Sequence, residues 1–188
     1  MSLLIVGLVA FLGVHLLPTF PRARLALVDR LGPQRYKLLF SLASAVGLVL
    51  IVFGFARSGP RVALFEPLPA AIVMAPSAMV IAFILFAAAN MRGHLRRALQ
   101  HPMLLGLLIW SGVHLLANGD RAGTVLFGAF LVYATVDLVS AVVRRAVKPF
   151  AAAVKFDLMA IVGGVGVAFA VMTFHRLLFG VPVVPFGV

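Results

Sequence analysis

The stretch Leu38–Ala56, LLFSLASAVGLVLIVFGFA, contains 19 residues and no Asp, Glu, Lys or Arg. A helix needs about 20 apolar residues to cross the hydrocarbon core of a bilayer, which is about 30 Å thick. The strands of a membrane barrel alternate between apolar and polar residues, and this stretch does not. Because lipid offers no hydrogen-bonding partner to the backbone, the stretch predicts a transmembrane helix.

Five further runs of this kind occur along the chain, with lengths of 21, 25, 22, 22 and 18 residues. In chain order they are Met1–Pro21, Pro67–Met91, Ala98–Gly119, Ala122–Val143 and Leu158–His175. Only one of them contains an acid, Asp137. We therefore expect an all-α fold, a polytopic bundle of six transmembrane helices that forms one domain over residues 1–188. Five spans with one re-entrant or interfacial segment are the alternative.

The composition also points to a membrane protein. Hydrophobic residues make up 63% of the 188 residues and charged residues 11%, whereas soluble domains carry about 25% charged residues. A soluble chain of this length cannot bury so much apolar surface, which excludes soluble enzymes, nucleic-acid binders and secreted disulfide-rich modules. The chain has no cysteine, so disulfides, thiolate metal sites and iron–sulfur clusters are excluded as well.

The net charge of +11 comes from basic residues that cluster between the apolar runs. Twelve Lys and Arg fall in the first, third and fifth loops and three in the second and fourth. The odd loops are therefore predicted to be cytoplasmic, with both termini outside. The residues of the odd loops are Arg22, Arg24, Arg30, Arg35, Lys37, Arg92, Arg96, Arg97, Arg144, Arg145, Lys148 and Lys155. Such loops suit an anionic membrane surface, so we expect membrane lipids and no nucleic acid as partners.

The first loop and the N-terminus carry two further expectations. Arg22–Leu31 is predicted to form a short interfacial helix, because its apolar residues recur at helical spacing between basic ones. The first apolar run has no positive segment before it, so we expect a retained span and not a cleaved signal peptide.

Two histidines lie in similar surroundings near the ends of the first and fourth runs. Each follows an aromatic residue by four positions and a glycine by eight, which places all three on one helix face. The two sets are Gly7, Phe11 and His15, and Gly106, Trp110 and His114. Neutral imidazole is a common haem ligand, and a flat cofactor needs small residues beside it. The alternative is that each histidine only forms a hydrogen bond between helices.

The remaining histidines have different predicted roles. His101 precedes His114 by 13 residues, which is about 20 Å along a helix, so both cannot bind one iron. We expect His101 to cap the fourth helix or to contact a cofactor carboxylate. His94 is expected in a solvated basic loop, and His175 at the outer membrane interface.

Asp137 is the only acid inside a predicted span. Two interpretations remain open. Its carboxylate extends toward Arg144 and Arg145 at the membrane surface, or it forms a buried hydrogen bond with Tyr133, four residues earlier on the same face.

The segment His101–Asp120, HPMLLGLLIWSGVHLLANGD, resembles the signature of the NnrU family. GVHLLP at residues 13–18 and YKLLFSLAS at residues 36–44 are similar to the N-terminal half of that family. NnrU proteins are bacterial inner-membrane proteins associated with denitrification and nitric oxide metabolism, and plant zeta-carotene isomerase, which uses b-type haem, is similar to them. The resemblance implies haem b as cofactor, and His15 and His114 match the positions of its axial ligands. Trp110, Gly106 and His101 are the further cofactor-binding candidates.

Three functions follow from this resemblance. The first is a haem b protein with a role in nitrogen oxide metabolism, together with a redox partner or a denitrification enzyme. The second is a haem-dependent isomerase of a lipid-soluble polyene, and the third is a non-catalytic membrane assembly partner. One geometric difficulty accompanies the haem hypotheses. His15 and His114 lie about two turns from opposite exits, so their depths are expected to differ by roughly 10 Å.

Overall fold

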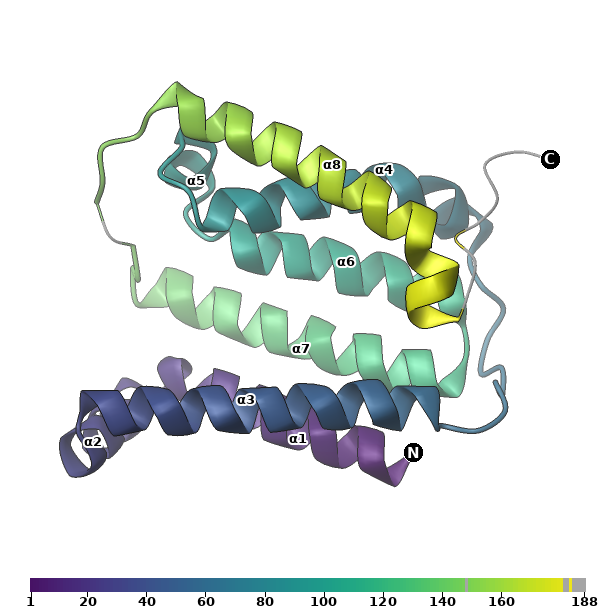
Figure 1. The fold of residues 1–188 in the computed structure, drawn as a ribbon, viewed down its shortest axis with the longest axis horizontal. Coiled ribbons are helices and arrows are strands. Elements are labelled where there is room, and N and C mark those ends of the chain that lie inside the picture. The colour runs from purple at the N-terminus through teal and green to yellow at the C-terminus, as the bar shows by residue number, and fades with distance from the viewer. Residues whose placement is uncertain (148, 181–182, 184–188) are drawn as a thin grey trace.

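The computed structural model describes residues 1–147, 149–180 and 183, and within them the chain is helical, with one isolated bridge between Ala63 and Asp120. Figure 1 shows the long helices lying side by side. The elements are α1 (Ser2–Leu16), η1 (Leu17–Thr19), α2 (Pro21–Leu31), α3 (Pro33–Ala56), α4 (Pro69–Ala89), α5 (His94–Leu99), α6 (Pro102–Asn118), α7 (Arg121–Val143) and α8 (Val154–Phe179). Lys148, counted above in the fifth loop, lies outside the described residues.

Local sequence signals explain where most helices begin. Four of them start at a proline, which loses nothing at a first helical position because the N–H there has no intrahelical partner. These prolines are Pro21, Pro33, Pro69 and Pro102. At the start of α7 the Asp120 carboxylate accepts a hydrogen bond from the backbone N–H of Gly123, at 2.9 Å. Gly119 supplies the left-handed turn before it, with φ of 68°.

Within the described part of the chain, five helical segments are long and apolar enough to cross a membrane, as expected of a multi-pass membrane protein. They are Ser2–Thr19, Pro33–Ala56, Pro69–Ala89, Arg121–Val143 and Val154–Phe179. The sixth expected span is shorter, because α6 has 17 residues and a length of about 26 Å. The short helix expected at Arg22–Leu31 is present as α2, and its interfacial position stays a prediction, whereas the short helix α5 was not predicted.

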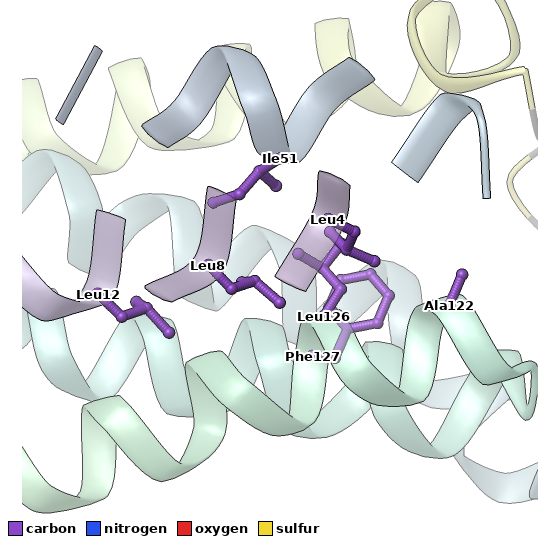
Figure 2. Close-up of a cluster of buried hydrophobic side chains, with 7 residues drawn as sticks. All are labelled: Leu4, Leu8, Leu12, Ile51, Ala122, Leu126 and Phe127. Atoms are coloured by element: carbon purple, nitrogen blue, oxygen red, sulfur yellow. The ribbon is translucent and has the colours of Figure 1, made fainter. Parts of the chain in front are cut away.

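The six long helices form a row of neighbours. The main contacts join α3 to α1, α1 to α7, α7 to α6, α6 to α4 and α4 to α8. In Figure 1 the α1–α3 pair lies on one side of α7, and α6, α4 and α8 lie on the other. Buried apolar side chains from α1, α3 and α7 form the cluster drawn in Figure 2. Helix α7 therefore connects the α1–α3 pair to the rest of the molecule.

Glycines bring α1 and α3 into backbone contact. A Cβ added to Gly7 would lie 2.6 Å from the backbone N of Ile51, and one added to Gly47 would lie 2.7 Å from the backbone N of Phe11. A Cβ added to Gly54 would likewise clash with the backbone of Leu4. Small residues of this kind let membrane helices approach closely, because association in lipid relies on van der Waals contact.

Candidate functional site

His15 lies one residue before the end of α1 and is partly buried among aromatic rings. The centroid of its ring is 4.2 Å from that of Phe11, 5.2 Å from that of Phe40 and 6.3 Å from that of Tyr133. Its Nδ1 is 2.7 Å from the carbonyl oxygen of Phe11. A carbonyl oxygen only accepts hydrogen bonds, so Nδ1 carries the proton and the lone pair of Nε2 remains available.

His114 has the same arrangement on α6. Its Nδ1 is 2.8 Å from the carbonyl oxygen of Trp110, so Nδ1 again donates and Nε2 keeps its lone pair. The ring centroid of His114 is 5.4 Å from that of Trp110 and 4.8 Å from that of Phe127. The two histidines, which have similar neighbours in the sequence, therefore also have similar surroundings in the structure.

Helix α7 places aromatic side chains between Phe11 of α1 and Trp110 of α6. Phe130 lies 5.9 Å from Phe11 and 5.4 Å from Trp110, measured between ring centroids. Phe127 packs on Trp110 at 5.1 Å. A continuous set of rings, which we call the aromatic contact, therefore runs from α1 across α7 to α6. It consists of Phe11, His15, Trp110, His114, Phe127, Phe130 and Tyr133.

The two histidines lie at different levels along α7. His114 packs against Phe127 and His15 against Tyr133, which is six residues further along that helix. Six helical residues correspond to about 9 Å, close to the difference in depth expected from the sequence. Each imidazole has the donor chemistry of an iron ligand, and ligation of one iron by both would have to bridge this difference in level. Haem ligation by His15 and His114 stays a prediction.

The glycines near the histidines serve helix packing. A Cβ on Gly106 would lie 2.8 Å from the ring of Phe86 and 3.0 Å from the carbonyl oxygen of Ala82, both on α4. Gly7 packs against α3. In this arrangement neither glycine leaves open space for a flat cofactor, because another helix already fills the place of the missing side chain.

His101 lies at the opposite end of α6 from His114, so the structure does not bring these two together. His101 is the N-cap residue of α6, as expected, although its side chain makes no capping hydrogen bond. Its backbone carbonyl accepts hydrogen bonds from the N–H groups of Leu104 and Leu105, both at 3.1 Å. Its Nε2 is buried and has no hydrogen-bonding partner among the residues that the structure describes. Contact with a cofactor carboxylate stays a prediction.

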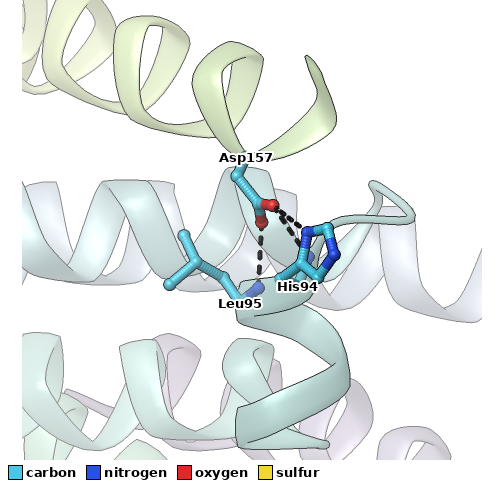
Figure 3. A network of polar contacts seen from close by, with 3 residues as sticks. All are labelled: His94, Leu95 and Asp157. Atoms are coloured by element: carbon cyan, nitrogen blue, oxygen red, sulfur yellow. Dashed lines mark hydrogen bonds and ion pairs between the residues drawn. The ribbon is translucent and has the colours of Figure 1, made fainter. Parts of the chain in front are cut away.

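His94 is not simply a residue of a solvated basic loop, and that expectation is corrected here. Figure 3 shows the carboxylate of Asp157, at the start of α8, accepting hydrogen bonds from three groups of α5. Oδ2 is 2.9 Å from the backbone N of His94 and 2.8 Å from its Nδ1, and Oδ1 is 2.9 Å from the backbone N of Leu95. This contact was not predictable from the sequence, because the residues are more than 60 positions apart.

The second interpretation of Asp137 is the one that the structure shows. The hydroxyl of Tyr133 donates a hydrogen bond to Oδ2 of Asp137, at 3.2 Å. Arg144 donates its Nε–H to Ser140 instead, at 3.0 Å. Tyr133 therefore links the only acid of a predicted span to the aromatic contact. At the far end of α8, the ring of His175 packs on that of Phe179, with 4.8 Å between centroids.

The chain was compared with known families, curated proteins and solved structures. A family model described as NnrU protein matches residues 3–183, which is nearly the whole chain. No curated protein and no solved structure matches it significantly.

Proposed function

The chain belongs to the NnrU family, and on that premise we propose that it is a six-span protein of the bacterial inner membrane that binds haem b. His15 and His114 are the proposed iron ligands, and Trp110 packs beside the second of them. The proposed role is in denitrification and nitric oxide metabolism, with a redox partner or a denitrification enzyme as protein partner. One observation carries the haem proposal. Both histidines donate Nδ1–H to a carbonyl of their own helix and keep Nε2 available within the aromatic contact.

The proposed sixth span is α6. In Figure 1 this helix lies between α4 and α7 and runs antiparallel to both. A helix of about 26 Å is slightly shorter than a typical hydrocarbon core, and a bilayer adapts to such a mismatch at modest cost. With six spans and basic odd loops, both termini lie outside.

Whether a haem fits these residues depends on how far His15 and His114 lie from each other along the axis of α7. The donor chemistry suits the group, because neutral imidazoles with a fixed Nδ1–H are good iron ligands. Ligation by both requires α1 to move along α7 by about 9 Å, with displacement of rings from the aromatic contact. Such a movement would also break the buried contacts of the α1 leucines with Leu126 and Phe127, and the close backbone contact of α1 with α3 means that these two helices would move together. When bound, haem supplies a redox-active iron that binds nitric oxide.

The first test is the absorption spectrum of the detergent-purified protein, expressed with ample haem, beside His15→Ala and His114→Ala. We expect a Soret band and a sharp reduced α-band, lost or shifted in both variants. His94→Ala is the matched control, because this histidine lies outside the aromatic contact, and its spectrum should equal that of the parent. Bands lost in only one variant would indicate single-histidine ligation.

A parent that stays colourless after haem is added back would contradict the proposal and favour a non-catalytic assembly partner. Turnover of a cis-polyene by the reduced, haem-loaded protein would favour the isomerase instead.

The movement of α1 is tested by a separate measurement, the distances between spin labels. The chain has no cysteine, so spin labels can be attached at Val9, Val46 and Val132, which are 69%, 57% and 64% exposed. Haem should change the distance from Val9 to Val132 and leave that from Val9 to Val46 unchanged.

A further inference from the structure

An open cleft of about 350 Å³ lies at the end of α1, where α2 and the start of α3 meet. It is lined by Pro18, Arg24, Tyr36, Lys37, Phe40 and Ser41. Two of these residues are cations and none is an acid. The cleft is separate from the aromatic contact, although Phe40 belongs to its wall and also packs on His15.

The cations of the cleft sit beside an aromatic surface. The guanidinium carbon of Arg24 lies 5.9 Å from the centroid of the Tyr36 ring, within the range of a cation–π interaction, which orients the side chain at the cleft. Lys37 follows Tyr36 directly and is exposed. The rings of Tyr36 and Phe40, together with Pro18, provide an apolar surface next to these two charges. A complementary ligand therefore has an anionic group attached to an apolar body.

The position of the cleft indicates which ligand of this kind it meets. Helix α2 has the composition of an interfacial helix, with three Arg and exposed apolar side chains such as Leu25. The leucines that follow the cleft on α3, Leu38, Leu39 and Leu42, are exposed and face lipid. The cleft thus lies where headgroups meet acyl chains. Polybasic segments at this level attract acidic lipids.

We propose that this cleft binds the headgroup of an anionic phospholipid. The phosphate lies between the side chains of Arg24 and Lys37, the Ser41 hydroxyl is available as a further hydrogen-bond donor, and the acyl chains follow the leucines of α3. Because Phe40 separates the cleft from His15, a bound lipid packs one ring away from that histidine.

The test uses the full-length protein in mixed phosphatidylglycerol and phosphatidylcholine, with native mass spectrometry of the lipids retained after transfer to detergent. We expect a one-to-one complex with phosphatidylglycerol. The double variant Arg24→Ala/Lys37→Ala should retain at least about tenfold less phosphatidylglycerol than the parent. Each cation near the membrane surface raises the affinity for acidic lipid about fivefold. The matched control is Arg30→Ala/Arg35→Ala, which removes the same charge from exposed positions outside the cleft. The control variant should retain clearly more phosphatidylglycerol than Arg24→Ala/Lys37→Ala.

Three outcomes would overturn the proposal. Equal losses in the two double variants would show only a general attraction of the basic loop to acidic lipid. A parent that retains no phosphatidylglycerol would show that the cleft is no lipid site. A cleft variant that keeps the lipid but loses haem would assign the two cations to cofactor carboxylates. Arg24→Lys, which keeps the charge, should retain the lipid, and unchanged thermal unfolding in phosphatidylcholine checks that the variants fold.

Discussion

Helix α1 contacts α3 through glycines and α7 through larger side chains, the leucines of the buried cluster and the rings of the aromatic contact, and the glycines bring two backbones together. Against α3, three glycines place the main chains of both helices within van der Waals distance. Against α7, side chains separate the main chains, namely the buried leucines of α1 and the rings of the aromatic contact, and fewer backbone positions come close. The same helix therefore packs backbone to backbone on one side and side chain to side chain on the other.

The difference follows from how helices associate in lipid. Lipid tails are as apolar as leucine, so burying large apolar side chains gains little, and close packing of small residues dominates. Rings packed edge to face stabilise a contact by about 0.5–1.5 kcal/mol per pair, and each can turn aside for another flat group. Both proposed iron ligands lie in the aromatic contact, where side chains and not backbones meet.

The largest expected effect is loss of the backbone contact between α1 and α3. Gly54→Val would place a side chain against the backbone of Leu4, which no rotamer change relieves. We expect a loss of about 3 kcal/mol or more in the free energy of unfolding, measured by thermal unfolding in detergent with circular dichroism. Gly13→Val is the matched control, because a Cβ at Gly13 has no neighbour within 4 Å. Equal losses in the two variants would show that α1 and α3 do not pack through their glycines.

A smaller effect is expected at the aromatic contact. Phe130→Ala removes the ring between Phe11 and Trp110. Truncating a fully buried Phe costs 3–5 kcal/mol, and Phe130 is only partly buried, so we expect a loss of about 2 kcal/mol. Phe169→Ala, at a lipid-facing position on α8, should change little.

The same variant separates the two contacts of α1. With spin labels at Val9, Val46 and Val132, Phe130→Ala should broaden the distance distribution from α1 to α7 and leave that from α1 to α3 narrow. Broadening in both distributions would mean that α1 moves independently of α3, against the close contact inferred from the glycines.

Features that depend on one segment of chain were predictable from the sequence. The apolar runs predicted the long helices, and Pro102 predicted the start of α6. The spacing of four residues correctly predicted an aromatic ring beside each histidine. The run Ala98–Gly119 overestimated its helix, because its first residues belong to the end of α5 and to a turn at Gln100 with φ of 61°. A count of uncharged residues does not detect such a turn.

Features that depend on which helices become neighbours were not predictable. Helical spacing predicted Gly106 on the face of His114, but it could not tell that α4 would cover the glycine while the histidine packs on Phe127 of α7. The phenylalanines of α7 are ordinary membrane sequence, and only the fold shows that they contact Phe11 of α1 and Trp110 of α6. Asp157 was missed because its partners lie on α5, a helix too short to give an apolar pattern.

The smallest expected effect concerns the polar part of the aromatic contact, the hydrogen bond from Tyr133 to Asp137. Side-chain hydrogen bonds within membrane proteins contribute about 0.6 kcal/mol on average and at most about 1.7 kcal/mol. A double-mutant cycle of Tyr133→Phe and Asp137→Ala should give a coupling energy in this range by thermal unfolding. Thr135→Val serves as the control, because its hydroxyl bonds only to a carbonyl of its own helix and faces lipid. Tyr133→Phe keeps the ring beside His15, so any haem spectrum should be unchanged. A coupling near zero, with a larger loss in Arg144→Ala, would instead place the carboxylate of Asp137 with the basic residues at the membrane surface.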